Sequence, residues 1–169
     1  PHTINFYQQL QAGLTVDISM QNDRALYLAH REEFNRINRG PQANSRKAAA
    51  LFYFLNRTGF NGLCRFNKSG GFNVPFGRHK TIRYTSDFTH YQPVLSDWEF
   101  VCGDFAMLDI AAGDFIYADP PYDVQFTAYA AGGFGWHEQE RLAAWLGQHD
   151  GPVVASNQAT ERILTLYRK

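Results

Sequence analysis

The residues best suited to chemistry in this chain follow a short apolar run, FIYA. They are Asp119, Pro120, Pro121 and Tyr122. The apolar run predicts a buried strand, so we expect these residues in the loop at its carboxyl end, where α/β sheets bind their ligands. The two prolines fix φ and cannot donate a hydrogen bond, which makes the loop stiff and leaves the Pro120 carbonyl free to accept one.

Two acceptors beside an aromatic face suit a planar ring that carries an amino group. The amine of adenine or cytosine is a poor nucleophile because its lone pair is delocalised into the ring. Hydrogen bonds from this amine to Asp119 and Pro120 favour a pyramidal nitrogen, and Tyr122 can stack on the ring. The loop therefore predicts attack of the amine on the methyl group of a sulfonium cofactor. A plain turn with Tyr122 in the core is the alternative.

Charged residues are segregated along a chain whose formal net charge is zero. Asp and Glu are absent from Phe34 to Ser86, and Lys and Arg are absent from Tyr84 to Glu140. This division indicates one part that faces a polyanion and another part with a different task, although a solvated basic face without a partner gives the same pattern.

The elements that position these residues follow from apolar spacing. It predicts helices over 2–11, 19–38, 46–57, 86–95, 136–150 and 159–167. Ser45 can cap the third helix and Gly59 can end it. Buried strands are expected over 99–105, 115–118 and 151–157, and a hairpin over 63–74. Strands that alternate with helices favour an α/β fold with a parallel sheet.

Longer motifs extend this interpretation. The blocks NRTGFNGLCRFN and GGFNVPFGRHK, with DPPY after a strand, resemble the Dam-type DNA adenine-N6 methyltransferases. The resemblance runs from PHTINFY through HREEFN to VVASN. It implies a Rossmann-like, S-adenosylmethionine-dependent methyltransferase domain with an inserted helical and β-hairpin recognition region. By this resemblance, residues 1–40 and 97–169 belong to the catalytic domain, and residues 41–96 recognise the target.

The resemblance also assigns contacts with double-stranded DNA. Those with bases fall to Phe60, Asn61, Leu63, Arg65 and Pro75, and those with phosphates to Arg57, Arg78 and Lys80. Arg65 matches a position that reads a guanine edge, because its guanidinium can bond O6 and N7 together. His79 matches the contact with the outer base, where relatives commonly carry Tyr. The expected target is GATC, whereas Phe66 and Phe72 are expected to pack in the core.

A target adenine must leave the duplex to reach the Asp119 loop. Phe126, Tyr129 and Phe134 either close over the flipped base or belong to the core. By resemblance, Asp104 and Phe105 join Asp119 in binding the cofactor, although Asp104 could instead cap the next turn. The glycine-rich cofactor loop of the family has no counterpart here, so we expect a segment before Pro1 and little activity from residues 1–169 alone.

The sequence disfavours several classes of protein. The six His show no metal-binding spacing, the two Cys lie in unrelated contexts, and no apolar run is long enough to cross a bilayer. We therefore expect a cytoplasmic monomer that acts on DNA without a metal ion or a membrane. Two alternatives stay open, an amino-methyltransferase for cytosine N4 or RNA and a non-catalytic DNA-binding remnant.

Overall fold

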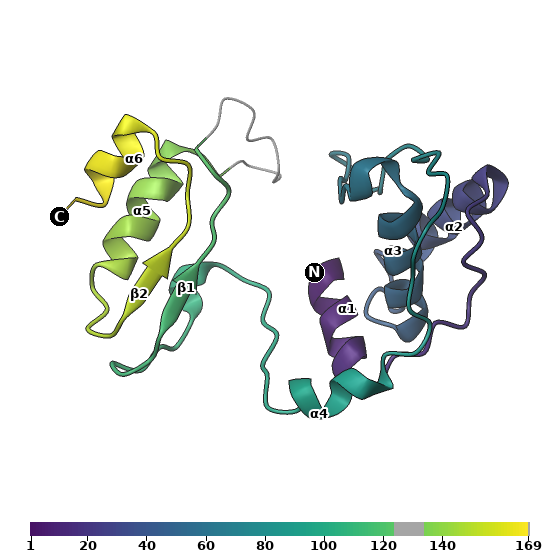
Figure 1. Cartoon of the computed structure of the whole chain (residues 1–169), viewed down its shortest axis with the longest axis horizontal. Coiled ribbons are helices and arrows are strands. Elements are labelled where there is room, and N and C mark those ends of the chain that lie inside the picture. The colour runs from purple at the N-terminus through teal and green to yellow at the C-terminus, as the bar shows by residue number, and fades with distance from the viewer. Residues whose placement is uncertain (124–133, 169) are drawn as a thin grey trace. The chain divides into compact units, whose positions relative to one another are not determined.

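The computed structural model describes residues 1–123 and 134–168, and the chain divides into two compact units, Pro1–Cys102 and Gly103–Lys169 (Figure 1). The first unit is helical, and the second combines helices with a parallel sheet, so the predicted mixture of α and β structure is confirmed. No helix within the described ranges is both long enough and apolar enough to cross a membrane. The same residues contain no cluster of three or more His, Cys, Asp or Glu able to hold a metal ion.

Three helices of ten or more residues form the main part of the first unit. They are α1 (His2–Gln11), α2 (Arg24–Ile37) and α3 (Arg46–Thr58), and α3 contacts both others. The Ser45 hydroxyl accepts from the Ala48 amide at 3.1 Å, which is the predicted cap of α3. The helix predicted from residue 19 instead begins at Arg24, because the Asp23 carboxylate caps it by accepting from the Leu26 amide at 2.8 Å.

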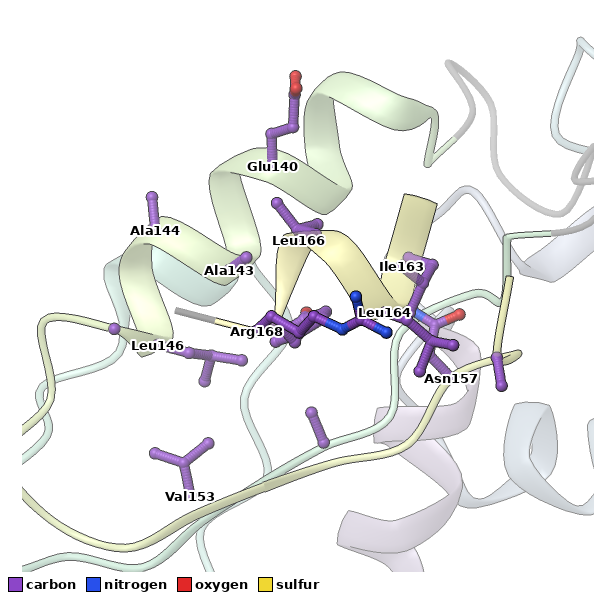
Figure 2. A pocket seen from close by; sticks show the side chains of 14 residues that line it. Glu140, Ala143, Ala144, Leu146, Val153, Asn157, Ile163, Leu164, Leu166 and Arg168 are labelled. Atoms are coloured by element: carbon purple, nitrogen blue, oxygen red, sulfur yellow. The ribbon is translucent and has the colours of Figure 1, made fainter. Parts of the chain in front are cut away.

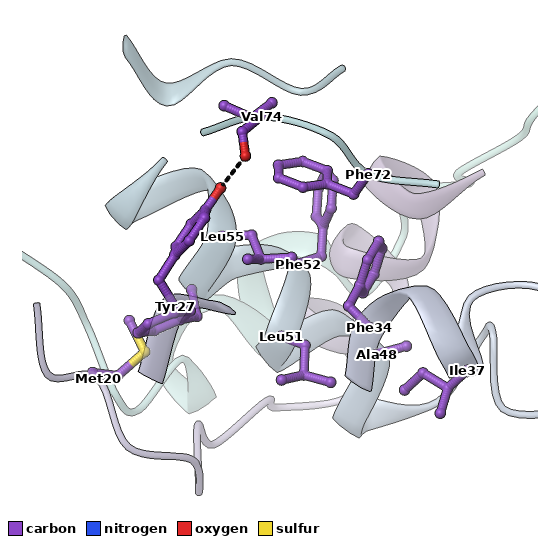
Figure 3. Close-up of a cluster of buried hydrophobic side chains, with 11 residues drawn as sticks. Met20, Tyr27, Phe34, Ile37, Ala48, Leu51, Phe52, Leu55, Phe72 and Val74 are labelled. Carbon is purple, nitrogen blue, oxygen red and sulfur yellow. Dashed lines mark hydrogen bonds between the residues drawn. The ribbon is translucent and has the colours of Figure 1, made fainter. Parts of the chain in front are cut away.

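The core of this unit joins α2 and α3 to a later segment (Figure 3). Its members include Tyr27, Phe34, Leu51, Phe52, Leu55, Phe72 and Val74. Phe34 is completely buried, and its ring meets Phe72 edge to face with centroids 6.1 Å apart. Burial of one such side chain contributes about 1.5–3 kcal/mol. Phe66 also packs against this cluster, so the expectation that Phe66 and Phe72 are core residues is confirmed.

The segment after α3 folds back on the end of that helix. The Phe60 amide donates to the Pro75 carbonyl and the Gly77 amide to the Thr58 carbonyl, both at 2.9 Å. Only glycine fits at position 59, because a Cβ there would lie 2.6 Å from the Leu55 carbonyl oxygen. The segment between Thr58 and Gly77 is therefore closed by these two hydrogen bonds and by the isolated antiparallel bridge between Gly59 and Phe76.

The predicted hairpin is present as a turn without long strands. The Asn67 amide donates to the Gly71 carbonyl at 2.8 Å, and the Asn73 amide donates to the Arg65 carbonyl at 3.1 Å. Between these bonds, Phe66 and Phe72 form an isolated antiparallel bridge. The chain reversal predicted over 63–74 is therefore present, but its pairing is too short to count as a ladder.

The last part of the first unit covers α1. A short 3₁₀ turn (Thr89–Tyr91) and α4 (Gln92–Leu95) form where a helix over 86–95 was predicted. Phe88 and Leu95 join Leu10 in a second apolar cluster. The helices from residues 1–40 and 41–96 therefore share one unit, and the predicted functional division between these ranges stays a prediction.

The second unit contains β1 (Ile116–Ala118) and β2 (Val153–Ala155), which pair in parallel with Ile116 opposite Val153. Its helices are α5 (Trp136–Leu146) and α6 (Glu161–Leu166), and a 3₁₀ turn spans Phe105–Met107. The order of strand, helix, strand and helix agrees with the prediction.

Two predictions about strands are wrong. No strand forms over 99–105, because this run is divided at the boundary between the units: Phe100 stacks on Tyr7, while Asp104 caps the 3₁₀ turn. The other two strands form but are not fully buried. Tyr117 is 62% exposed between half-buried neighbours, as in a strand covered on one face, and Val154 is 48% exposed.

Candidate functional site

The predicted chemical loop lies at the carboxyl end of β1. The Ser156 amide donates to the Ala118 carbonyl at 2.9 Å, which extends the pairing with β2 by one step. This pairing brings the Ser156 hydroxyl to Asp119, where it donates to one carboxylate oxygen. Asp119 is exposed, and its second oxygen accepts no hydrogen bond from any residue that the structure describes. The carboxylate is thus held on one side and open on the other.

The carbonyl groups of the two prolines have different surroundings. Pro120 is buried, and its carbonyl accepts no hydrogen bond from residues 1–123 or 134–168. The Pro121 carbonyl, in contrast, accepts from Nε2 of Gln139 at 2.8 Å. The Tyr122 ring is 45% exposed. The loop therefore presents one side-chain acceptor, one main-chain acceptor and an aromatic face.

Asp119 and Pro120 border a small apolar pocket of about 220 Å³. Its other walls include Phe105, Leu108, Ile110, Phe134, Leu142 and Trp145. This volume is below the roughly 300–1,000 Å³ of pockets that enclose drug-sized ligands, so it suits one planar ring. Phe134 lines this pocket, whereas Phe126 and Tyr129 lie outside the described residues.

A larger pocket of about 1200 Å³ lies between α5, β2 and α6 (Figure 2). Leu146, Val153 and Ile163 give it an apolar lining, and Asn157 reaches its edge. None of the four residues of the Asp119 loop lines it. The smaller pocket is therefore the better candidate site, because it combines a ring-sized space with both acceptors.

Asp104 has a structural partner. Nη1 and Nη2 of Arg141 donate to its two carboxylate oxygens at 2.9 and 2.6 Å, and the Ala106 amide donates at 2.9 Å. The hydrogen bonds from Arg141 lower the pKa of Asp104 to about 2. The same guanidinium lies 4.1 Å from the centre of the Phe105 ring. Asp104 thus caps the turn that presents Phe105 to the pocket, and its predicted role toward a cofactor stays a prediction.

Sequence reasoning missed the residues that hold the loop in place. Besides Ser156, they are Asp123, Gln139, Asn157 and Arg162. The Asp123 carboxylate pairs with Arg162 and accepts from the Thr160 hydroxyl at 3.0 Å; hydrogen bonding to Arg162 lowers the pKa of Asp123. One signal was present in the sequence, because Gln139 occupies a position in the apolar stripe of α5.

The predicted DNA-contacting residues all belong to the first unit and surround the turn after α3. Those that are exposed are Arg57, Phe60, Asn61, Leu63, Arg65, Pro75, Arg78 and Lys80, while His79 is half-buried. The hydrogen bond between the Phe60 amide and the Pro75 carbonyl joins the two halves of this set. Asn61 and Arg78 both have φ of 52°, a left-handed conformation that is uncommon outside glycine.

The side chain of Arg65 is already oriented. Its Nε donates to Oδ1 of Asn73 at 2.9 Å, and its Nη2 donates to the Asn73 carbonyl at 3.2 Å. These bonds fix the plane of the guanidinium and leave Nη1 without a partner among the described residues. An oriented fork loses less side-chain entropy when it binds a planar acceptor pair.

A polar pocket of about 350 Å³ lies beside this turn and is lined by Arg57, His79 and Arg83, among others. Nε of Arg57 donates to the Arg83 carbonyl at 2.8 Å, which holds the guanidinium at the pocket. The His79 ring lies 3.0 Å from the Gly59 carbonyl through Nε2. Two guanidinium groups at one pocket favour an anion such as a phosphate.

Comparison with known proteins gives a consistent result. A family model described as "D12 class N6 adenine-specific DNA methyltransferase" matches residues 2–169. The retron Ec67 DNA adenine methylase of Escherichia coli is 34% identical over 99% of this chain and 62% of its own length. The DNA N-6-adenine-methyltransferase of Escherichia phage P1 is 36% identical, and the match covers 97% of this chain and 24% of that protein. The DNA adenine methylase of Escherichia coli K12 is 34% identical, and the match covers 90% of this chain and 57% of that protein. The chain thus spans less than two thirds of each of these relatives.

Proposed function

Because this chain belongs to the D12 class of N6 adenine-specific DNA methyltransferases, we propose that its protein methylates N6 of adenine in double-stranded DNA. S-adenosylmethionine is the proposed donor and a Rossmann-like domain the proposed scaffold. The observation that carries the proposal is the loop after β1, where Asp119 has one carboxylate oxygen without a hydrogen bond from the described residues, the Pro120 carbonyl likewise accepts none, and the Tyr122 ring is exposed. The names of the relatives support the same substrate and position of methylation.

The proposed role of the loop is to prepare the amine. The Asp119 carboxylate and the Pro120 carbonyl accept the two N6 protons, and Tyr122 stacks on the ring. This arrangement directs the nitrogen lone pair out of the ring plane, toward the electrophilic methyl group that S-adenosylmethionine supplies when bound. The cofactor would take the electron pair of its C–S bond on sulfur, and the role of Asp119 and Pro120 is to hold the two N6 protons until one of them leaves to water. Positioning and electrostatics supply most of the acceleration.

The pocket is proposed to take the adenine ring of the cofactor. Phe105 gives it an aromatic wall, and Asp119 gives it a polar edge. Asp104 is proposed to help bind the cofactor indirectly, by capping the turn that positions Phe105. Arg141 donates to its carboxylate and stacks on the Phe105 ring. A pocket of about 220 Å³ fits this ring and not a whole nucleoside cofactor.

The first unit is proposed to recognise GATC, with target recognition assigned to residues 41–96. Arg65, oriented by Asn73, is proposed to read a guanine edge, and the exposed Phe60 ring to enter the stack as the adenine flips out. Asn61, Leu63 and Pro75 are proposed to contact bases, and His79 the outer base. Arg57, Arg78 and Lys80 are proposed to contact phosphates, which fix position without reading sequence.

The test is methyl transfer by the complete gene product. The protein is incubated with methyl-labelled S-adenosylmethionine and with duplexes that contain or lack GATC, and the labelled base is identified after digestion. We expect N6-methyladenine on the GATC duplex alone. Asp119→Ala should lower the rate by roughly 10²–10³-fold, the usual effect of removing one group that stabilises the transition state. Asp109→Ala, an exposed carboxylate outside the pocket, is the matched control. Label in N4-methylcytosine, or full activity of Asp119→Ala, would contradict the proposal.

A further inference from the structure

A buried glutamine contacts the loop from α5. Gln139 shares the buried face of α5 with Leu142 and Leu146 and is 1% exposed. Its Nε2 donates to the Pro121 carbonyl at 2.8 Å, and its Oε1 accepts from Nδ2 of Asn157 at 3.0 Å. A buried amide costs free energy unless it is hydrogen-bonded, so both contacts are needed for Gln139 to occupy this apolar face.

Asn157 carries the hydrogen bonds back into the loop. Its Oδ1 accepts from the Asp123 amide at 3.1 Å and from the Gln158 amide at 2.8 Å. The two side chains thus bond the carbonyl directly before Tyr122 and the N–H directly after it. Both peptide groups that flank Tyr122 are held, while its ring stays 45% exposed.

The direction of this chain of amides is fixed at both ends by the backbone. The Pro121 carbonyl can only accept, so Gln139 must present Nε2 to it and Oε1 to Asn157. The Asp123 amide can only donate, so Asn157 must present Oδ1 to it and Nδ2 to Gln139. Reversal of either amide would place two acceptors or two donors against each other.

We propose that Gln139 and Asn157 are positioning residues for methyl transfer. They hold the peptide groups on either side of Tyr122, and with them the stacking ring and the neighbouring Pro120 carbonyl. Neither amide touches the reacting atoms. The inference rests on the proposed function of the loop, and it predicts that loss of either donor slows the chemical step without weakening DNA binding. A displacement near 1 Å in a site of this kind costs on the order of 10²-fold in rate.

Gln139→Glu tests this through pH. At high pH the introduced carboxylate has no proton for the Pro121 carbonyl and repels it. At low pH the protonated carboxyl donates to Pro121 and accepts from Asn157, as the amide does. Burial raises the pKa of such a carboxyl, so the change should fall within the range of the assay. The other charged groups near this contact are the same in wild type and variant. Asp123 pairs with Arg162, Glu138 pairs with Arg141 and lies beside His137, and Asp119 lies at the loop itself.

The measurement is the single-turnover rate of the complete protein on a duplex that the wild type methylates, at about pH 6 and about pH 8.5. At the higher pH, we expect the single-turnover rate of Gln139→Glu to be roughly 10–100-fold below that of wild type. At the lower pH, most of this rate should be recovered. The affinity for the duplex, measured by filter binding, should change by less than about threefold, because the DNA-contacting residues are untouched. Gln148→Glu, an exposed residue of the same type just after α5, should follow wild type throughout.

A second variant covers the case in which Gln139→Glu does not fold. Asn157→Asp is nearly isosteric, half-buried, and keeps the acceptor for the Asp123 amide. The aspartate has no donor for Oε1 of Gln139. If the Gln139 amide flips, its Nε2 can donate to the aspartate, but the hydrogen bond to the Pro121 carbonyl is then lost. We expect a rate loss of about tenfold with duplex affinity unchanged.

The outcomes separate this inference from the proposed function. A wild-type rate for Asn157→Asp would overturn the positioning role, and so would a loss in Gln139→Glu that is equal at both pH values or is matched by weaker DNA binding. In either case the proposed function stands if wild type transfers the methyl group and Asp119→Ala does not. If wild type transfers none, the proposed function itself fails.

Discussion

The segment 72–75 belongs to the proposed target-recognition region. One of its contacts with the core, at the buried Val74 carbonyl, can be tested quantitatively. The Val74 carbonyl accepts from the Tyr27 hydroxyl at 2.8 Å and from Nη1 of Arg31 at 3.1 Å (Figure 3 shows the first bond). Tyr27 and Val74 are completely buried. Burial raises the pKa of Tyr27 to about 12, so its hydroxyl stays a donor at neutral pH. The perturbation is the pair Tyr27→Phe and Arg31→Met, made singly and together.

The loss in the free energy of unfolding depends on how many donors to the Val74 carbonyl remain. After Tyr27→Phe the carbonyl keeps its bond from Arg31, so the cost is that of one net hydrogen bond, about 1 kcal/mol. Arg31→Met leaves the tyrosine bond, and because Arg31 is half-exposed its loss also costs about 1 kcal/mol. The double variant leaves the buried Val74 carbonyl without a donor, and desolvation of an unpaired polar group costs a further 1–3 kcal/mol or so. The double variant should therefore lose about 3–5 kcal/mol, clearly more than the two single losses together.

The assay is urea unfolding followed by circular dichroism, with the free energy of unfolding taken from the midpoint and the slope for wild type and all three variants. The difference between the double variant and the sum of the singles is the coupling free energy. A coupling below about 0.5 kcal/mol would show that the carbonyl finds another donor, and the reasoning would be refuted. A loss above about 3 kcal/mol for Tyr27→Phe alone would refute it too, since Arg31 would then not compensate.

Three further predictions concern a helix cap, an ion pair and the proposed DNA interface. Ser45→Ala removes the cap of α3 and should lower the free energy of unfolding by about 1 kcal/mol, measured by urea unfolding. Hydrogen bonds from Arg141 lower the pKa of Asp104 from its ordinary 3.8 to about 2. The stability they contribute is therefore present above pH 3.8 and is lost as the pH falls toward 2. The difference in unfolding midpoint between wild type and Asp104→Asn should shrink over that window; a constant difference would contradict this. Arg65→Ala should reduce the preference for GATC duplexes by about 1–3 kcal/mol, whereas Lys80→Ala should weaken binding to all duplexes alike and lower the salt slope by about one. Binding titrations at several salt concentrations distinguish these two effects.

The helices were predictable because their signals are local. Apolar spacing and a capping residue lie within a few positions of each other, so α1 and α3 begin and end close to the predicted residues. The strand predicted over 99–105 failed because an apolar run specifies burial and not its partner. Phe100 finds that partner in α1, on the Tyr7 ring, and the run is interrupted at Gly103.

The same distinction applies to the candidate site. Asp119 and the prolines are recognisable because their chemistry lies in four consecutive residues. Gln139 and Asn157 act on the loop from positions 18 and 34 residues away from their partners Pro121 and Asp123. No pattern in the sequence states such a contact, although a glutamine in an apolar stripe indicates that some buried partner exists.

In the segment 72–75, buried and exposed side chains alternate. Phe72 and Val74 are buried, whereas Asn73 and Pro75 between them are exposed. Because successive side chains of extended backbone point to opposite sides, two residues anchor the segment while the other two face outward, where DNA is proposed to bind. Substitutions at the exposed positions change the proposed DNA contacts without opening a cavity in the core, whereas substitutions at the buried positions displace every outward side chain at once. A change in target preference is therefore expected to arise at the outward positions of this segment, with its inward residues and the Tyr27 anchor unchanged.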